Sequence, residues 1–179
     1  MLLIDIGGGS TELVVAEGDI PTMRVSTPLG VVALTERYLT DAFPTDKAWE
    51  GLRYEIKGVL WDTVPKLPKN PLFVGTAGTL TTLAAMDQKM AIYDPSRING
   101  YRLSKEAIEA IFNKFKSMTS EERLLVPGLE RGREDVIMAG IVILLTLMGL
   151  CHYDEVYISD EGLREGVLID RYLKGVEGE

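Results

Sequence analysis

The stretch LLIDIGGGSTELVV, residues 2–15, places two apolar runs on either side of a glycine-rich turn. Each run has the apolar, β-branched composition of a strand, so the stretch predicts two adjacent strands. Asp5 lies in the first run, two residues before the triplet formed by Gly7, Gly8 and Gly9. A plain hairpin turn remains the alternative. A plain turn would need only one glycine and no aspartate inside an apolar strand. Because this stretch has three glycines and Asp5, we favour a binding loop.

The residue types in this turn suit a phosphate and a metal ion. Glycines leave backbone N–H groups open to an oxyanion that a Cβ would keep away. Ser10 and Thr11 add hydroxyl donors at the same turn. The carboxylate of Asp5 could hold Mg²⁺, directly or through water, or it could orient an attacking water.

A second glycine loop, VGTAGT at residues 74–79, follows an apolar run and precedes a helical pattern. The N-terminus of a helix attracts anions through its unpaired N–H groups and the helix dipole. The loop lacks the lysine of a Walker A motif and does not match GxGxxG, so an anion site and an ordinary strand-to-helix turn both stay open. Its candidate binding residues are Gly75, Thr76, Gly78 and Thr79.

The remaining pattern predicts an α/β fold with a mixed sheet, in which an antiparallel edge hairpin joins parallel strands flanked by helices. The tripeptide NGY in RINGYRLS, residues 97–104, indicates a small hairpin that turns at Asn99 and Gly100. Ser104 and Thr119 are expected helix N-caps, the latter in a capping box with Glu122. The expected elements are strands at 2–6, 11–19, 20–28 and 155–159, a strand–turn–helix unit at 72–86, and helices at 30–43, 45–64, 105–115, 136–151 and 162–173.

Composition limits the classes of partner. A formal net charge of −8 and a mean hydropathy of +0.08 argue for a globular chain and against nucleic-acid or membrane-surface binding. The longest apolar run, 136–151, is shorter than the roughly 20 residues of a membrane span. Cys151 is the single cysteine and His152 the single histidine, so we expect no disulfide, no zinc site and a cytoplasmic location.

Several motifs together resemble a known family. The segments are DIGGGSTEL, STPLGVVALTERYL, VGTAGTLTTLAAM, RINGYRLS, GLERGREDVIMAGIVIL and VYISDEGLREGVL, and they span essentially the whole chain. In this order they resemble the second lobe of the exopolyphosphatase / guanosine pentaphosphate phosphohydrolase (Ppx/GppA) family, within the actin-like ATPase superfamily.

The resemblance implies a ribonuclease-H-like lobe. Its second phosphate loop would be DIGGGST, with Asp5 on the metal or the water and Gly7 through Thr11 around a phosphate. VGTAGT would line the substrate cleft. The implied reaction is Mg²⁺-assisted hydrolysis of a terminal phosphoanhydride in inorganic polyphosphate or at the 5′ end of pppGpp.

The family's first phosphate loop and its catalytic glutamate have no counterpart in these 179 residues. We therefore expect residues 1–179 to form a single C-terminal lobe, inactive without the missing N-terminal lobe. Glu12 is expected to brace the turn rather than to replace the general base, and Asp160 is expected to cap a helix or face the cleft. The arginines that could attract a polyanion are Arg97, Arg102, Arg131, Arg133 and Arg164, none of them assigned as a ligand.

Two other functions compete with the hydrolase. One is an ATP-binding lobe of an actin-like ATPase or sugar kinase, which would transfer phosphate to an acceptor. The other is a sensor that binds polyphosphate or a guanosine tetra- or pentaphosphate without turnover. An apolar surface left by a neighbouring lobe could also make the chain form a homodimer.

Overall fold

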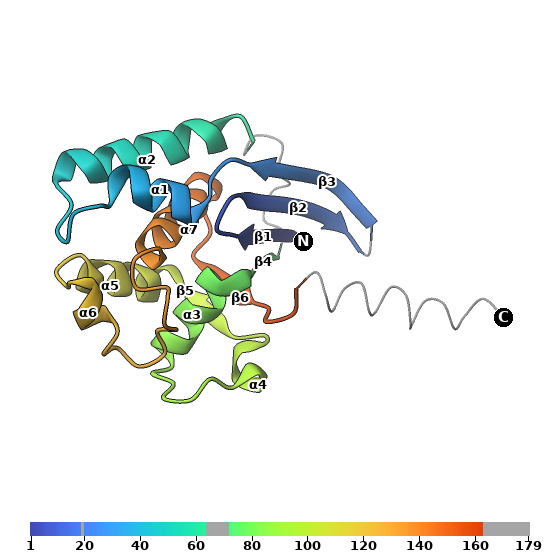
Figure 1. Ribbon diagram of the computed structural model, residues 1–179. Coiled ribbons are helices and arrows are strands. Elements are labelled where there is room, and N and C mark those ends of the chain that lie inside the picture. Colours follow the sequence, from blue (N-terminus) through green and yellow to red (C-terminus); the bar gives the residue numbers. More distant parts are fainter. Residues whose placement is uncertain (19, 64–71, 163–179) are drawn as a thin grey trace.

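The computed structural model describes residues 1–18, 20–63 and 72–162, shown in colour in Figure 1. These residues form a six-stranded mixed sheet with the strand order β3-β2-β1-β4-β6-β5. The strands are β1 (Leu2–Ile6), β2 (Thr11–Glu17), β3 (Ile20–Thr27), β4 (Phe73–Thr76), β5 (Arg102–Ser104) and β6 (Glu155–Ile158). The α/β class and the mixed sheet predicted from the sequence are thus confirmed.

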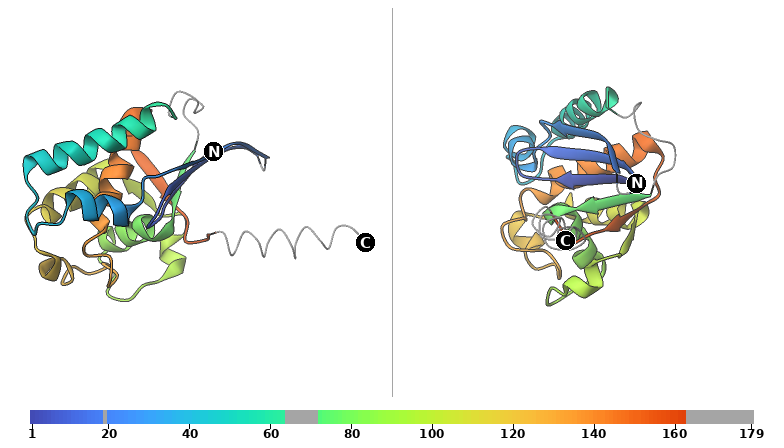
Figure 2. Two further views of the ribbon diagram at one scale, coloured as in Figure 1. Left: turned by 45° about the horizontal axis from the view of Figure 1, so that its top comes forward. Right: turned by 90° about the vertical axis from the view of Figure 1, so that its right-hand side faces the viewer.

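The centre of the sheet is parallel and both edges are antiparallel. Strand β4 pairs in parallel with β1 on one side and with β6 on the other. Strands β1, β2 and β3 form an antiparallel meander, and β5 pairs antiparallel with β6. Figure 2 shows the β2–β3 ribbon extending beyond the helices. The carboxyl ends of β1, β4 and β6 therefore lie side by side at one edge of the sheet.

Seven helices accompany the sheet within the described residues. They are α1 (Val31–Tyr38), α2 (Asp46–Trp61), α3 (Ala77–Asp87), α4 (Pro95–Ile98), α5 (Lys105–Phe115), α6 (Ser120–Arg123) and α7 (Ile137–Cys151). The apolar helix α7 is almost fully buried along its first half and packs against α1, α2 and α5 (Figure 1). No helix in the described part of the chain is long and apolar enough to cross a membrane.

Local signals in the sequence located several helix starts correctly. Ser104 accepts a hydrogen bond from the backbone N–H of Ala107, and Thr119 forms the predicted capping box with Glu122. Thr45 caps α2 in the same manner through Ala48. Side-chain acceptors at these positions satisfy N–H groups that a helix cannot pair internally.

The prediction of a hairpin over residues 97–104 is wrong. Residues 95–98 instead form α4, and Arg102–Ser104 form β5, which pairs with β6 rather than with its own neighbours. Gly100 has a φ of +75°, so the expected turn exists, but it leads from a helix into an edge strand. Helix α1 also ends earlier than predicted, at Tyr38. The helix predicted over 162–173 falls almost entirely outside the described residues.

Candidate active site

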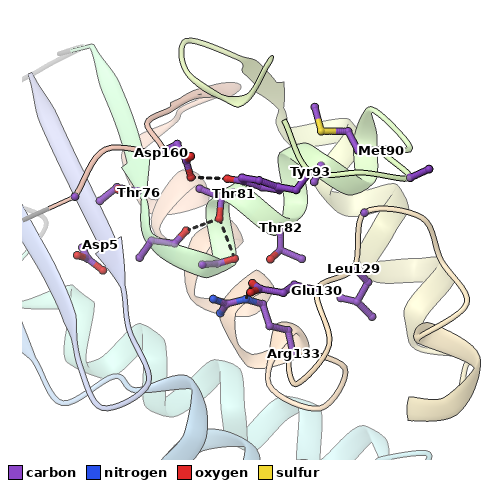
Figure 3. Close-up of a pocket in the computed structure, with 16 residues that line it drawn as sticks. Asp5, Thr76, Thr81, Thr82, Met90, Tyr93, Leu129, Glu130, Arg133 and Asp160 are labelled. Atoms are coloured by element: carbon purple, nitrogen blue, oxygen red, sulfur yellow. Dashed lines mark hydrogen bonds and ion pairs between the residues drawn. The ribbon is translucent and has the colours of Figure 1, made fainter. Parts of the chain in front are cut away.

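A cavity of about 730 Å³ opens at the carboxyl ends of the parallel strands (Figure 3). Asp5 comes from β1, Thr76 from β4 and Asp160 from just after β6, and helix α3 lies along the cavity. In open α/β sheets ligands bind outside the carboxyl ends of the strands. The lining residues are Asp5, Thr76, Ala77, Gly78, Thr81, Thr82, Ala85, Met90, Ala91, Tyr93, Gly128, Leu129, Glu130, Arg133, Asp160 and Gly162.

Asp5 is half-buried in this cavity and faces a second carboxylate. In the β1–β2 ladder Asp5 is directly opposite Glu12, so both side chains leave the same face of the sheet. Burial raises the pKa of Asp5 above its usual range, and the charge of Glu12 raises it further. Two like charges at this spacing repel each other unless a cation lies between them or close by.

Glu12 braces the glycine turn, as the sequence predicted. Its Oε1 accepts a hydrogen bond from Ser10 Oγ at 2.5 Å and another from Ser26 Oγ at 2.7 Å. The Thr11 hydroxyl is buried and donates to the carbonyl of Leu29 at 2.6 Å. Both hydroxyls that were predicted to contact phosphate are therefore engaged in fixing the loop in this structure.

The loop of Gly7, Gly8 and Gly9 packs against the start of α1. The N–H groups of Val31 and Val32 donate to the carbonyls of Gly7 and Gly8, each at 3.1 Å. These carbonyls replace the missing side-chain cap of α1. Among the described residues, the N–H groups of Gly8 and Gly9 have no backbone acceptor, and both residues are exposed.

The glycine that this packing requires most is Gly30, which no motif in the sequence marks. A Cβ added to Gly30 would lie 2.5 Å from the Cα of Gly9 and would also overlap the carbonyl of Gly8. None of the loop's three glycines has a positive φ, so their conformational freedom is not used. Close approach of two backbones explains Gly30. The loop lies beside Asp5 but does not itself line the cavity.

The second predicted loop differs from expectation in its local geometry. Strand β4 runs directly into α3, and the turn between them falls on Ala77, with a φ of +67°, rather than on a glycine. Thr76 and Gly78 line the cavity, and Thr76 Oγ1 donates to the carbonyl of Glu161 at 3.1 Å.

Gly75 and Thr79, also predicted as ligands, lie on the other side of this junction, in the core. A Cβ on Gly75 would meet the side chain of Leu80, and Thr79 packs against Gly140 of α7. The structure thus brings Asp5, Thr76 and Gly78 together in one cavity and leaves Gly75 and Thr79 outside it.

Two side-chain pairs form opposite walls of the cavity (Figure 3). On one wall the Tyr93 hydroxyl donates to Asp160 Oδ1. Burial and this carboxylate raise the pKa of Tyr93 to about 12, so the hydroxyl keeps its proton. On the other wall Arg133 Nε contacts Glu130 Oε2 at 2.6 Å, and its guanidinium occupies the space that a Cβ on Gly78 would fill.

Of the five arginines considered from the sequence, Arg133 lines the cavity. Arg102 pairs instead with Glu155 at 3.4 Å on the β5–β6 edge, and Arg164 lies outside the described residues. Asp160 faces the cavity, which was one of its two predicted positions. Tyr93 and Glu130 were missed, because no local motif marks them and only the fold brings them into the same cavity as Asp5.

The donor set around Asp5 fits Mg²⁺. Mg²⁺ prefers oxygen ligands, and proteins usually hold it through one or two carboxylates while water and substrate phosphates complete the shell. Asp5 and Glu12 offer two carboxylates on one face of the sheet. The described residues contain no cluster of three or more carboxylate, histidine or cysteine side chains that would form an all-protein metal cage.

Comparison with known proteins agrees with this geometry. The family model described as the Ppx/GppA phosphatase family matches residues 1–175. The chain belongs to this family. The Ppx/GppA chain is 29% identical over 174 residues to "Exopolyphosphatase 2" of Mycobacterium tuberculosis, covering 94% of this chain and 54% of that protein. It is 29% identical to the "Bifunctional 3-dehydroquinate synthase/phosphatase" of Fusobacterium nucleatum, covering 99% of this chain and 26% of that protein.

The solved structure of the Aquifex aeolicus Ppx/GppA enzyme has a similar fold. It superposes with a TM-score of 0.89 at 35% sequence identity, and the match covers 94% of this chain and 56% of that chain. The chain therefore spans about half the length of the exopolyphosphatase and of the solved enzyme that it matches. The neighbour also places the sheet and helices described above in the actin-like ATPase fold, as the sequence predicted.

Proposed function

We propose that this chain is one lobe of a Mg²⁺-dependent phosphoanhydride hydrolase. The substrate would be inorganic polyphosphate or pppGpp, from which the enzyme releases the terminal phosphate or the 5′-phosphate. The observation that carries the proposal is Asp5, a half-buried carboxylate at the carboxyl end of β1, between an exposed glycine loop and a cavity. Family membership and the names of the relatives point to the same chemistry.

In this proposal each group of residues has one task. The free N–H groups of Gly8 and Gly9 bind a phosphate oxygen and stabilise the charge that develops as the bond breaks. Asp5, with Glu12 opposite, holds Mg²⁺ or the water next to it. The ion supplies Lewis-acid polarisation of the phosphoryl group and neutralises its charge. Thr76 and Gly78 form the adjoining wall of the substrate cleft.

We further propose that a second lobe completes the site. Glu12, the carboxylate opposite Asp5 at the glycine loop, is occupied by two serine hydroxyls. The chain also spans about half of its exopolyphosphatase relative. A partner lobe would supply the general base and the first phosphate loop.

The proposal is tested by binding of long-chain polyphosphate to the chain with and without Mg²⁺. At a net charge of −8 the chain should repel polyphosphate unless the ion bridges them. Binding should therefore require Mg²⁺ and weaken with added salt, and Asp5→Ala should abolish the Mg²⁺ effect. Asp62→Ala, an exposed carboxylate at the end of α2, is the matched control. Equal binding after chelation and in Asp5→Ala would reject the proposal.

A further inference from the structure

Helix α2 presents two large aromatic side chains to solvent. Tyr54 is 83% exposed and Trp61 is 61% exposed, while the opposite face of the helix is buried against the core. The helix packs on α1 and α7 and lies at the outside of the molecule (Figure 1). Within the described residues, the contact made by these rings is with Lys57, whose Nζ lies 5.9 Å from the centre of the Trp61 ring. Neighbouring exposed aromatic residues of these types are typical of protein–protein contact surfaces.

The exposed side of α2 carries a stripe of residues with a spacing of seven. Lys47, Tyr54 and Trp61 follow one another at this spacing, which keeps their side chains on one side of an α-helix. Glu50 and Lys57 lie on the same side between them, and all five residues are exposed. These five residues are called the α2 stripe. Its three charged side chains have no ion-pair partner in the part of the chain that the structure describes.

The α2 stripe is complementary to itself when two copies of the helix run antiparallel. Tyr54 is at its centre, seven residues from both Lys47 and Trp61. A two-fold axis at Tyr54 therefore places each Lys47 against the Trp61 ring of the second copy, an arrangement that attracts a cation. Glu50 and Lys57 lie on the same flank of the stripe, and like flanks meet in such a pair. Glu50, four residues before the centre, then lies beside Lys57 of the second copy, three residues after it.

We propose that the α2 stripe is a docking surface for a second copy of this chain, with the two α2 helices antiparallel. A contact that is complementary to itself is what a two-fold dimer requires, because each residue meets its counterpart pair twice. None of the five residues of the stripe lines the cavity beside Asp5, so the dimer leaves both cavities open. One pair of 16-residue helices makes a small interface, so the dimer should dissociate on dilution.

Sedimentation equilibrium and tryptophan fluorescence test the proposal, over chain concentrations from about 5 to 500 μM, the range of a weak dimer. The chain should change from monomer to dimer, and its emission should move to shorter wavelength as the Trp61 ring leaves water. Trp49 is already buried, so this shift reports on Trp61. Tyr54→Ser should weaken association by about tenfold or more, because the tyrosine is at the centre of the contact. Ile92→Ser, an exposed apolar residue outside α2, is the matched control and should associate as the wild type does.

Exchanging the charges of the stripe tests the antiparallel arrangement itself. Glu50→Lys and Lys57→Glu should each weaken the dimer, because each places like charges side by side, and the double variant should restore it. A chain that stays monomeric at the highest concentration would overturn the proposal. A dimer that Tyr54→Ser does not weaken, or a double variant no stronger than its single variants, would also overturn it. If joining a first lobe to the chain shifts the Trp61 emission at the lowest concentration, that lobe covers the stripe and the proposal is wrong.

Discussion

Substituting Gly30 with alanine tests whether the glycine loop depends on contact with the start of α1. The backbone of Gly30, with φ −99° and ψ 137°, is accessible to alanine, so the substitution introduces no strain of its own. The new methyl group would lie 2.5 Å from the Cα of Gly9 and would overlap the Gly8 carbonyl. Because these contacts are with backbone, the loop itself must move.

The expected cost follows from two opposing effects. Overpacking of a tight contact costs about 1–3 kcal/mol. Replacing glycine with alanine also restricts the unfolded chain, which stabilises the folded state by about 0.4–1 kcal/mol. We therefore expect Gly30→Ala to lower the free energy of unfolding by up to about 2.5 kcal/mol. We also expect it to weaken Mg²⁺-dependent tripolyphosphate binding because the loop N–H groups are displaced.

Urea denaturation measures the change in stability, and calorimetry measures the change in tripolyphosphate binding, on the same samples. The matched control is Gly58→Ala inside α2, where an added Cβ has no neighbour within 4 Å. That variant should be more stable by about 0.5–1 kcal/mol, from helix propensity alone, with binding as in the wild type. If Gly30→Ala were as stable as Gly58→Ala and bound tripolyphosphate normally, the account of how the loop is held would be refuted.

Two further substitutions test the electrostatics and the packing around the cavity. Burial and Glu12 raise the pKa of Asp5 in the folded state, so its ionisation costs stability above the unfolded pKa. Asp5→Asn should therefore raise the free energy of unfolding near pH 7, and this increase over the wild type should vanish below about pH 4. An increase in stability that became larger on acidification would contradict the raised pKa of Asp5. Arg123 is buried and donates to the carbonyls of Phe115 and Glu134. Three guanidinium nitrogens make these bonds and lysine has only one nitrogen, so Arg123→Lys should lower the free energy of unfolding by about 1–3 kcal/mol. An unchanged midpoint of urea denaturation would argue against that role.

Features that depend on neighbouring residues could be predicted from the sequence. The strands on either side of the glycine turn, the capping residues Ser104 and Thr119, and the buried helix α7 all follow from local composition and spacing. The position of Asp5 near the end of β1 also followed, because the apolar run and the glycines after it were visible together. These signals act over a few residues, where side-chain chemistry and backbone preference decide the outcome.

Features that depend on distant contacts could not be predicted in the same way. The segment ending in β5 has the composition of a hairpin. Its strand pairs with β6 instead, so tertiary contacts rather than local composition determine its structure. The left-handed turn falls on Ala77 although Gly75 and Gly78 flank it closely. Tyr93 lines the cavity, where its hydroxyl donates to Asp160, a residue far away in sequence.

The most direct test of the central claim is phosphate release from pppGpp and from long-chain polyphosphate in the presence of Mg²⁺. The chain should be assayed alone and joined to a first lobe from the same family, each with and without Asp5→Asn. We predict that only the two-lobe protein releases phosphate, that chelation of Mg²⁺ stops the release, and that Asp5→Asn abolishes it. A two-lobe protein that releases no phosphate, or that remains fully active with Asp5→Asn, would contradict the account.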